Sequence, residues 1–114
     1  INCAINPLSA LHNCYNGELA EAPALRDRVI ALCAEIASVA QAAGYDQLAN
    51  DLEEQVFAVI RGTADNRSSM LQDLRAGRRT EIDYLTGYLV RLADELNIRV
   101  PMNLQLLKEI KAHD

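Results

Sequence analysis

The chain has 114 residues, of which 50% are hydrophobic and 24% are charged, and its formal net charge is −5. That length suits one domain with its own hydrophobic core, and the composition is too apolar for a disordered chain. An acidic chain with few aromatic residues is not expected to bind nucleic acid, and no apolar run reaches the roughly 20 residues that a membrane-spanning helix needs.

The three cysteines favour a protein with reduced thiols. Cys3, Cys14 and Cys33 are odd in number and have neither CxxC spacing nor the Cys/His spacing of a zinc site. His12 stands two residues before Cys14, a spacing that directs the two side chains to opposite sides of a helix. We therefore expect free cysteines, no bound metal and a cytoplasmic location.

The first stretch, INCAINPL, predicts a helix with a polar stripe. Asn2 and Asn6 are four residues apart and share one helical face, which Ser9 continues. Asparagine is a poor helix former, so this pair is either a solvent-exposed face or a row of amides held for binding. No capping residue precedes the stretch, and we expect Ile1 to lie within a longer helix that starts upstream.

Pro7 is expected to bend or break this first helix, because proline cannot donate a hydrogen bond to the carbonyl of Cys3. The carbonyl that it leaves free, beside two amide side chains, is either solvated at a kink or part of a polar pocket. From the pattern alone, the solvated kink is the favoured alternative.

Hydrophobic periodicity predicts two long helices in the first half of the chain. One starts at Pro23, which suits a first helical turn, and ends before Gly44, which can adopt a left-handed cap. The second covers about 47–62. Their inward-facing residues are predicted to be Leu25, Val29, Leu32, Ile36 and Val39 in the first, and Leu48, Leu52, Val56, Val59 and Ile60 in the second.

The second half of the chain predicts three shorter helices. A helix through SSMLQDLRA is expected to be capped by Asp65 or Asn66 and closed by Gly77, another follows Thr80, and Pro101 starts the last. Their apolar stripes are Ile82, Leu85, Leu89, Leu92 and Leu96, and then Leu104, Leu107 and Ile110. No stretch alternates like a strand, so we predict an all-α bundle of five or six helices.

Two polar stretches lie outside these stripes. In NRSSMLQD, Asn66 and Ser69 are three residues apart and are expected on similar sides of the helix. The alternative is a helix cap for Asn66 and a solvated hydroxyl for Ser69. In GRRTEIDY, Glu81 and Asp83 would occupy the first turn of a helix capped by Thr80, where carboxylates complement the helix dipole. Neither stretch by itself indicates which reaction the protein catalyses or which ligand it binds.

Taken together, three stretches resemble one enzyme family, ketopantoate reductase (2-dehydropantoate 2-reductase). They are INCAINPLSALHNCYNGEL, NRSSMLQDLRAGRRTEIDYLTGY and IRVPMNLQLLKEIK, in this order and at this spacing. The resemblance implies that residues 1–114 form the helical C-terminal domain of an enzyme whose N-terminal Rossmann domain carries NADPH. The GxGxxG fingerprint of a Rossmann domain is absent from this chain.

The family reduces the 2-keto group of ketopantoate to give pantoate, a step toward pantothenate and coenzyme A. The resemblance implies a lysine, four residues before Asn2, that acts as general acid. Asn2 and Asn6 match asparagines that hold the hydroxy acid, and Ser69 matches a serine that bonds the substrate carboxylate. Glu81 matches a functional glutamate near the lysine and the nicotinamide, which makes it the catalytic and cofactor-binding candidate. Asn66 is a further substrate-binding candidate, with a capping role as the alternative.

Without the lysine and the nucleotide-binding domain, we expect the 114-residue chain to be inactive on its own. The expected partners are a small 2-keto acid, the Rossmann domain of the same protein and, as a homodimer, a second copy of the chain. Two alternatives remain at this stage: a stand-alone helical interaction or dimerisation module, and a paralogue that reduces another 2-keto acid.

Overall fold

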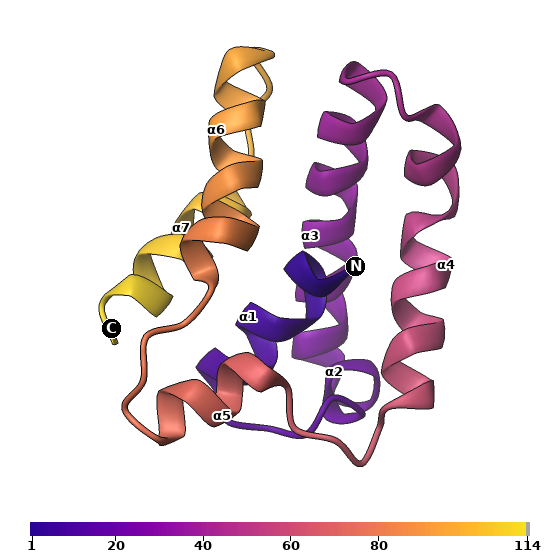
Figure 1. Cartoon of the computed structure of the whole chain (residues 1–114). Helices are drawn as coiled ribbons and strands as arrows, with labels where there is room; N and C mark the ends of the chain where they lie inside the picture. Colours follow the sequence, from indigo (N-terminus) through magenta and orange to yellow (C-terminus); the bar gives the residue numbers. More distant parts are fainter. Residues whose placement is uncertain (114) are drawn as a thin grey trace.

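The computed structural model describes residues 1–113, and all regular elements in this part of the chain are helices. In chain order (Figure 1) they are α1 (Asn2–His12), α2 (Glu18–Glu21), α3 (Pro23–Ala42), α4 (Asp46–Gly62), α5 (Ser69–Arg75), the π-helical segment η1 (Asp83–Gly87), α6 (Tyr88–Glu95) and α7 (Pro101–Lys111). The predicted all-α class is therefore confirmed; periodicity did not predict α2, a single turn, or the π-helical form of η1. None of the helices within residues 1–113 has both the length and the apolar character needed to cross a membrane.

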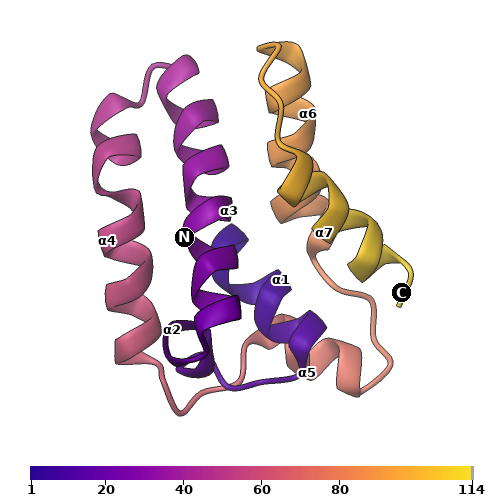
Figure 2. The same cartoon turned by 180° about the vertical axis from the view of Figure 1, so that it is seen from behind.

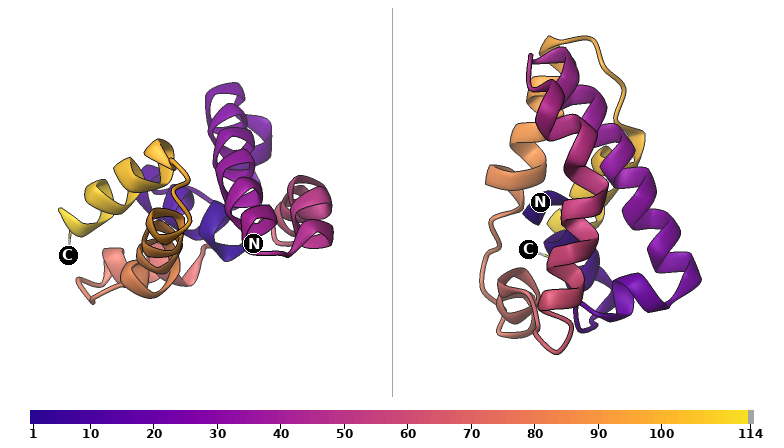
Figure 3. Two further views of the ribbon diagram at one scale, coloured as in Figure 1. Left: turned by 90° about the horizontal axis from the view of Figure 1, so that it is seen from above. Right: turned by 90° about the vertical axis from the view of Figure 1, so that its right-hand side faces the viewer.

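The helices form two arms with α1 between them. The α3–α4 hairpin is antiparallel, and α6 and α7 lie on the other side of α1, as the front and back views agree (Figures 1 and 2). The side view in Figure 3 places α5 at one end of the bundle. Helix α1 is central because it contacts α2, α3, α4, α5, α7 and η1.

The main core gathers around α1. Its largest fully buried side chains are Ile5, Leu8, Leu19, Val29, Leu32, Leu52, Ile60, Met70, Leu71, Ile82, Leu106 and Ile110. Proline and glycine bound the longest helix as predicted: Pro23 is the first residue of α3, and Gly44 follows its end with a φ of 93°, which glycine adopts without strain. Pro7 does not break α1, which runs from Asn2 to His12 around a buried Pro7, so a break was the wrong expectation.

The inward face of α4 differs in part from the prediction. Leu52, Val56 and Ile60 are buried, but Leu48 and Val59 are 47% and 36% exposed. Leu48 lies in the first turn of α4, which begins at the tip of the α3–α4 hairpin (Figure 1). The missed residue is Phe57, which is buried with the Arg26 guanidinium 4.6 Å from its ring centroid. Phe57, covered by the Arg26 guanidinium of α3, therefore faces inward where Val59 was predicted to do so.

The cap of α5 and the buried face of α7 differ from the prediction. The cap of α5 is Ser68, whose hydroxyl oxygen accepts a 3.1 Å hydrogen bond from the Leu71 N–H, so Asp65 and Asn66 were wrong candidates. Helix α7 begins at Pro101 as predicted, but Leu104 is exposed and Asn103 is buried in its place. The reason is a carboxylate on another helix, described next.

Glu35 of α3 caps the N-terminus of α7. Its two carboxylate oxygens accept hydrogen bonds from the backbone N–H groups of Met102 (2.9 Å) and Asn103 (3.0 Å). The Asn103 side-chain amide donates to the same carboxylate at 2.7 Å, which turns Asn103 inward. A carboxylate at a helix N-terminus satisfies unpaired N–H groups and complements the helix dipole. Glu35 therefore fixes where α7 sits on α3.

Candidate functional site

The polar stripe of α1 passes from solvent into the protein. Asn2 is exposed at the first position of the helix, Asn6 is half-buried, and Ser9 is fully buried. The N-terminal end of α1 lies between α6 and the α3–α4 hairpin (Figures 1 and 3). The predicted alternative of a wholly solvent-exposed face is therefore wrong for this stripe, because only its first residue is exposed.

Ser9 joins α1 to the start of α5. Its hydroxyl donates to the backbone carbonyl of Asn6 at 3.1 Å and lies 2.6 Å from the hydroxyl of Ser68. Both serines are buried, with exposed fractions of 0% for Ser9 and 6% for Ser68. Because Ser68 precedes Ser69 directly, this contact brings the segment that carries Asn6 next to the segment that carries Ser69.

Ser69 and Asn66 do not share a helix. Ser69 is the first residue of α5 and is exposed, whereas Asn66 lies in the preceding loop, so the expected i, i+3 relation on one helix is wrong. Asn66 lines a polar hollow of about 500 Å³ together with Tyr15 and Arg67. The Arg67 guanidinium lies 5.0 Å from the Tyr15 ring centroid and donates a 3.3 Å hydrogen bond to its hydroxyl, which places positive charge beside Asn66.

A pair of loops holds the Asn66 segment against the end of α1. The backbone N–H of Asn16 donates to the Asn66 carbonyl, and that of Gly17 donates to the Ala64 carbonyl, both at 3.0 Å. The Asn16 side-chain amide also donates to the Thr63 hydroxyl at 3.0 Å, while its buried carbonyl oxygen has no partner within residues 1–113. Sequence reasoning missed this pairing, although the Asn-Gly dipeptide is a turn signal that marks the loop.

Glu81 is exposed in the connection between α5 and η1. Its backbone carbonyl accepts from the N–H groups of Tyr84 (2.9 Å) and Leu85 (3.0 Å), but its carboxylate has no hydrogen bond or ion pair within residues 1–113. The Thr80 hydroxyl accepts from the Ile82 N–H at 3.4 Å, but the N-cap of η1 is Ile82, so Thr80 is not the cap that we predicted and Glu81 precedes the first turn. Helix α1, which carries Asn2 and Asn6, contacts α5, which begins with Ser69, and η1, which Glu81 precedes in sequence.

The charged side chains near these residues are those of Glu81 and, in the hollow beside Asn66, of Arg67 and Asp65, whereas the amides and hydroxyls are neutral. Burial raises the pKa of the Cys3 thiol, which lies between Asn2 and Asn6 along α1, so this thiol is protonated at neutral pH. Within residues 1–113, no group of three or more His, Cys, Asp or Glu side chains is arranged to hold a metal ion. Amides and hydroxyls of this kind recognise polar ligands by hydrogen bonds.

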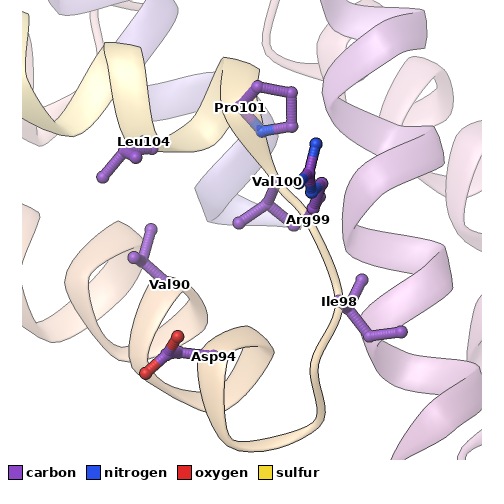
Figure 4. A pocket seen from close by; sticks show the side chains of 7 residues that line it. All are labelled: Val90, Asp94, Ile98, Arg99, Val100, Pro101 and Leu104. Carbon is purple, nitrogen blue, oxygen red and sulfur yellow. The ribbon is translucent and has the colours of Figure 1, made fainter.

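An apolar hollow of about 350 Å³ lies elsewhere, between α6, α7 and the loop that joins them. Val90 of α6 and Leu104 of α7 point toward each other across it (Figure 4), and Asp94 and Arg99 contribute charged groups to its lining. None of the five predicted site residues lines this hollow. This hollow is therefore separate from the candidate site formed by Asn2, Asn6, Asn66, Ser69 and Glu81.

Solved structures of ketopantoate reductases contain the same fold. A PanE/ApbA family ketopantoate reductase from Ralstonia eutropha JMP134 superposes with a TM-score of 0.88 and 32% identity, over 98% of this chain and 37% of that one. A D-mandelate dehydrogenase, solved with NADH and anilino(oxo)acetate, has the same TM-score over the same shares of both chains. At 23% identity, the latter similarity concerns the fold alone.

Sequence comparison defines the family. The family model described as "Ketopantoate reductase PanE/ApbA C terminal" matches residues 1–114. The 2-dehydropantoate 2-reductase of Yersinia pestis is 50% identical over 111 residues, which cover 97% of this chain and 36% of that protein. The chain therefore belongs to the ketopantoate reductase PanE/ApbA C-terminal family. It spans little more than a third of the length of the curated relatives that it matches.

Proposed function

We propose that this chain is the substrate-binding and catalytic helical domain of an NADPH-dependent reductase that converts 2-dehydropantoate to pantoate. The observation that carries the proposal is the match along the whole chain: relatives from bacteria and archaea, 35–50% identical over at least 97% of the chain, are all named 2-dehydropantoate 2-reductase. The neighbouring polar groups of α1 and α5 support a site for a small polar acid.

In this proposal, uncharged groups recognise the substrate. Asn2 and Asn6 offer amide donors and acceptors from one stripe of α1, and the exposed Ser69 hydroxyl offers a donor to the substrate carboxylate. Asn66 contributes from the adjoining loop, where Arg67 supplies a positive charge for an anionic ligand, next to the negative charge of Asp65 in the same hollow. Sites at the interface between two domains commonly combine groups in this way.

The reaction needs a proton donor at the keto oxygen, because adding hydride to the carbon leaves the bonding electron pair on that oxygen. We assign this role to a lysine four residues before Asn2, whose ammonium group gives up its proton as the alcohol forms. Glu81 orients that ammonium group and stabilises its charged form, since a nearby anion favours the protonated amine.

NADPH supplies the hydride when bound, and this chain has one group suited to contact it. The Glu81 carboxylate is exposed and unpaired within residues 1–113, so it can accept hydrogen bonds from cofactor hydroxyl or amide groups. The chain contains no GxGxxG sequence, so we assign the phosphates of the cofactor to a Rossmann domain of the same protein. Free thiols in the described part of the chain support a cytoplasmic enzyme.

The test is an assay of the full-length protein with NADPH or NADH and a series of 2-keto acids. We expect kcat/KM for 2-dehydropantoate with NADPH to exceed that for any other combination by at least roughly tenfold. No NADPH oxidation with 2-dehydropantoate would refute the proposal. A preference for another 2-keto acid would identify a paralogue, and turnover by the 114-residue chain alone would contradict the assignment of hydride donor and acid to other parts of the protein.

A further inference from the structure

We propose that Ser9 and Ser68 form a buried hydroxyl relay that positions Asn6 and Ser69 relative to each other, and that this relay sets the affinity of the site for its substrate. The inference rests on the proposed function, because Asn6 and Ser69 are the substrate-binding residues in that proposal. Ser9 and Ser68 are positioning residues, since neither contacts the substrate.

The proton count fixes the direction of the relay. Each serine hydroxyl has one proton, and Ser9 directs its proton to the carbonyl of Asn6 at 3.1 Å. In the 2.6 Å contact between the hydroxyls, Ser9 must therefore be the acceptor and Ser68 the donor. The oxygen of Ser68 accepts in turn from the Leu71 N–H at 3.1 Å. The hydrogen bonds thus run in one direction, from the first turn of α5 to the backbone of Asn6.

This relay is the buried side-chain hydrogen bond between α1 and the start of α5, whereas the backbone hydrogen bonds of Asn16 and Gly17 link the adjoining loops. The other side chains packed where α1 meets α5, such as Leu8 and Leu71, are apolar, and apolar contacts tolerate small shifts of one helix along another. A second polar link, from the Arg75 guanidinium to the side-chain amide oxygen of Asn13, is 3.5 Å long and exposed, at the far end of α1 from Asn2. A buried hydrogen bond that water cannot replace costs more to break than an exposed one.

The relay connects the elements that carry two predicted substrate ligands. Its acceptor end is the backbone carbonyl of Asn6, and its donor end is the first turn of α5, where Ser68 directly precedes Ser69. Displacing one helix along the other would therefore change the separation of the two substrate-binding groups. Misplacement of binding groups by an ångström or less is enough to weaken a site substantially.

The experiment measures steady-state kinetics of the full-length enzyme with Ser9→Ala, Ser68→Ala and the double variant, well below their melting temperatures. Ser38→Ala is the matched control, because Ser38 also donates to a backbone carbonyl of its own helix but is exposed. We expect Ser9→Ala to raise KM for 2-dehydropantoate roughly tenfold, the equivalent of one intramolecular hydrogen bond, with KM for NADPH within about twofold of wild type. Ser9→Thr, which keeps the hydroxyl, should restore most of the affinity.

Non-additivity provides the second criterion. Because the two serines act through one hydrogen bond, the double variant should have a KM within about twofold of Ser68→Ala, whereas independent effects would multiply. An unchanged KM in Ser9→Ala, or a lowered melting temperature with normal KM, would overturn the relay while leaving the proposed function intact. If the wild-type enzyme fails to reduce 2-dehydropantoate, the proposed function fails and the inference fails with it.

Discussion

Glu81 is the residue for which a structural role and a catalytic role are most easily separated. It is exposed, its carboxylate is unpaired within residues 1–113, and it lies just before η1, where a negative charge would also favour the helix N-terminus. Asp83 is a matched control two residues away, because it is also exposed and its carboxylate pairs with Lys111 at 3.2 Å.

We predict that Glu81→Gln lowers kcat of the full-length enzyme roughly a hundredfold, within the range of general acid–base elements. Removing the anion lowers the pKa of the proposed lysine, so the basic limb of the pH–rate profile should move to lower pH. Asp83→Asn should leave kcat near wild type. If both variants lose under about 1 kcal/mol of stability and neither changes kcat, the only role of Glu81 is to stabilise the N-terminus of the helix.

At the residue scale, the sequence did not predict which residue caps α5. Asp65, Asn66 and Ser68 are all good helix caps, and local preference does not choose among them. The choice depends on Ser9, which lies 59 residues away from Ser68 along the chain and contacts it through tertiary structure. A buried hydroxyl pair of this kind has no local sequence signal.

At the scale of elements, the pairing of the Asn16–Gly17 loop with the loop before α5 depends on close packing. A Cβ atom added to Gly17 would lie 2.8 Å from the Cβ of Ala64 and 3.1 Å from its carbonyl oxygen. The φ of Gly17 is −59°, so the need for glycine is one of space and not of backbone conformation.

Gly17→Ala should therefore destabilise the chain by about 1–3 kcal/mol, the usual cost of overpacking a rigid neighbour. Gly62→Ala is the control, because Gly62 ends α4 and a Cβ atom added there would meet nothing within 4 Å. This control should be neutral or stabilising by up to about 1 kcal/mol. Denaturant unfolding of both variants measures the difference. Equal free energies of unfolding for the two variants would mean that the two loops can move apart to accommodate the methyl group without loss of stability.

The Glu35 cap makes a second prediction for elements. Glu35→Ala removes three hydrogen bonds at the N-terminus of α7 and should lower the free energy of unfolding by about 2 kcal/mol. Glu54→Ala, which removes an exposed carboxylate of α4, should change it by less than about 0.5 kcal/mol. Chemical denaturation of the two variants provides the comparison, and equal losses would show that the cap contributes nothing specific.

Elements were predictable where their signals are local. Proline and glycine mark the ends of α3, and three of five predicted inward residues of α4 are buried. Phe57 was missed because Val56, its neighbour in sequence, was assigned to the inward face, although Phe57 lies three residues before Ile60 and a wide helix face can bury both. The burial of Asn103 and the exposure of Leu104 depend on Glu35, which no pattern within residues 101–111 reveals.

At the scale of the whole molecule, burial in the core keeps the cysteine thiols protonated and slows their reaction with reagents. Burial raises the pKa values of the Cys14 and Cys33 thiols to about 11, with a smaller contribution from nearby carboxylates. At pH 8 only about one thiol in a thousand would then be a thiolate, which is the reactive form.

We predict slow modification of Cys14 and Cys33 by a thiol reagent in the native protein, and rapid modification of all three cysteines in denaturant. Because a raised pKa keeps the thiols protonated, the native rate should still rise about tenfold per pH unit between pH 8 and 9.5. A rate that levels off near pH 9 would mean ordinary, accessible thiols. Cys3, which is only half-buried, provides the internal comparison after peptide mapping.

The overall class was predictable from the sequence, but the arrangement of helices was not. Helical period along most of the chain, without strand alternation, is enough to indicate an all-α domain. That α1 lies between two arms, in contact with six other elements, depends on which apolar faces match, and periodicity does not contain that information. The proximity of α1, α5 and η1, on which the candidate site depends, therefore came from the structure.

The Glu35 cap also has a consequence for the order in which the protein is completed during synthesis. Glu35 leaves the ribosome 67 residues before Met102, the first N–H that it binds. At translation rates of about 5–20 residues per second, roughly 3–13 s pass between the synthesis of Glu35 and that of Met102. The α3–α4 hairpin can form in that interval, but α7 cannot pack against α3 until it has been synthesised. We therefore expect the packing of α7, and not the folding of the hairpin, to be the step that completes the domain.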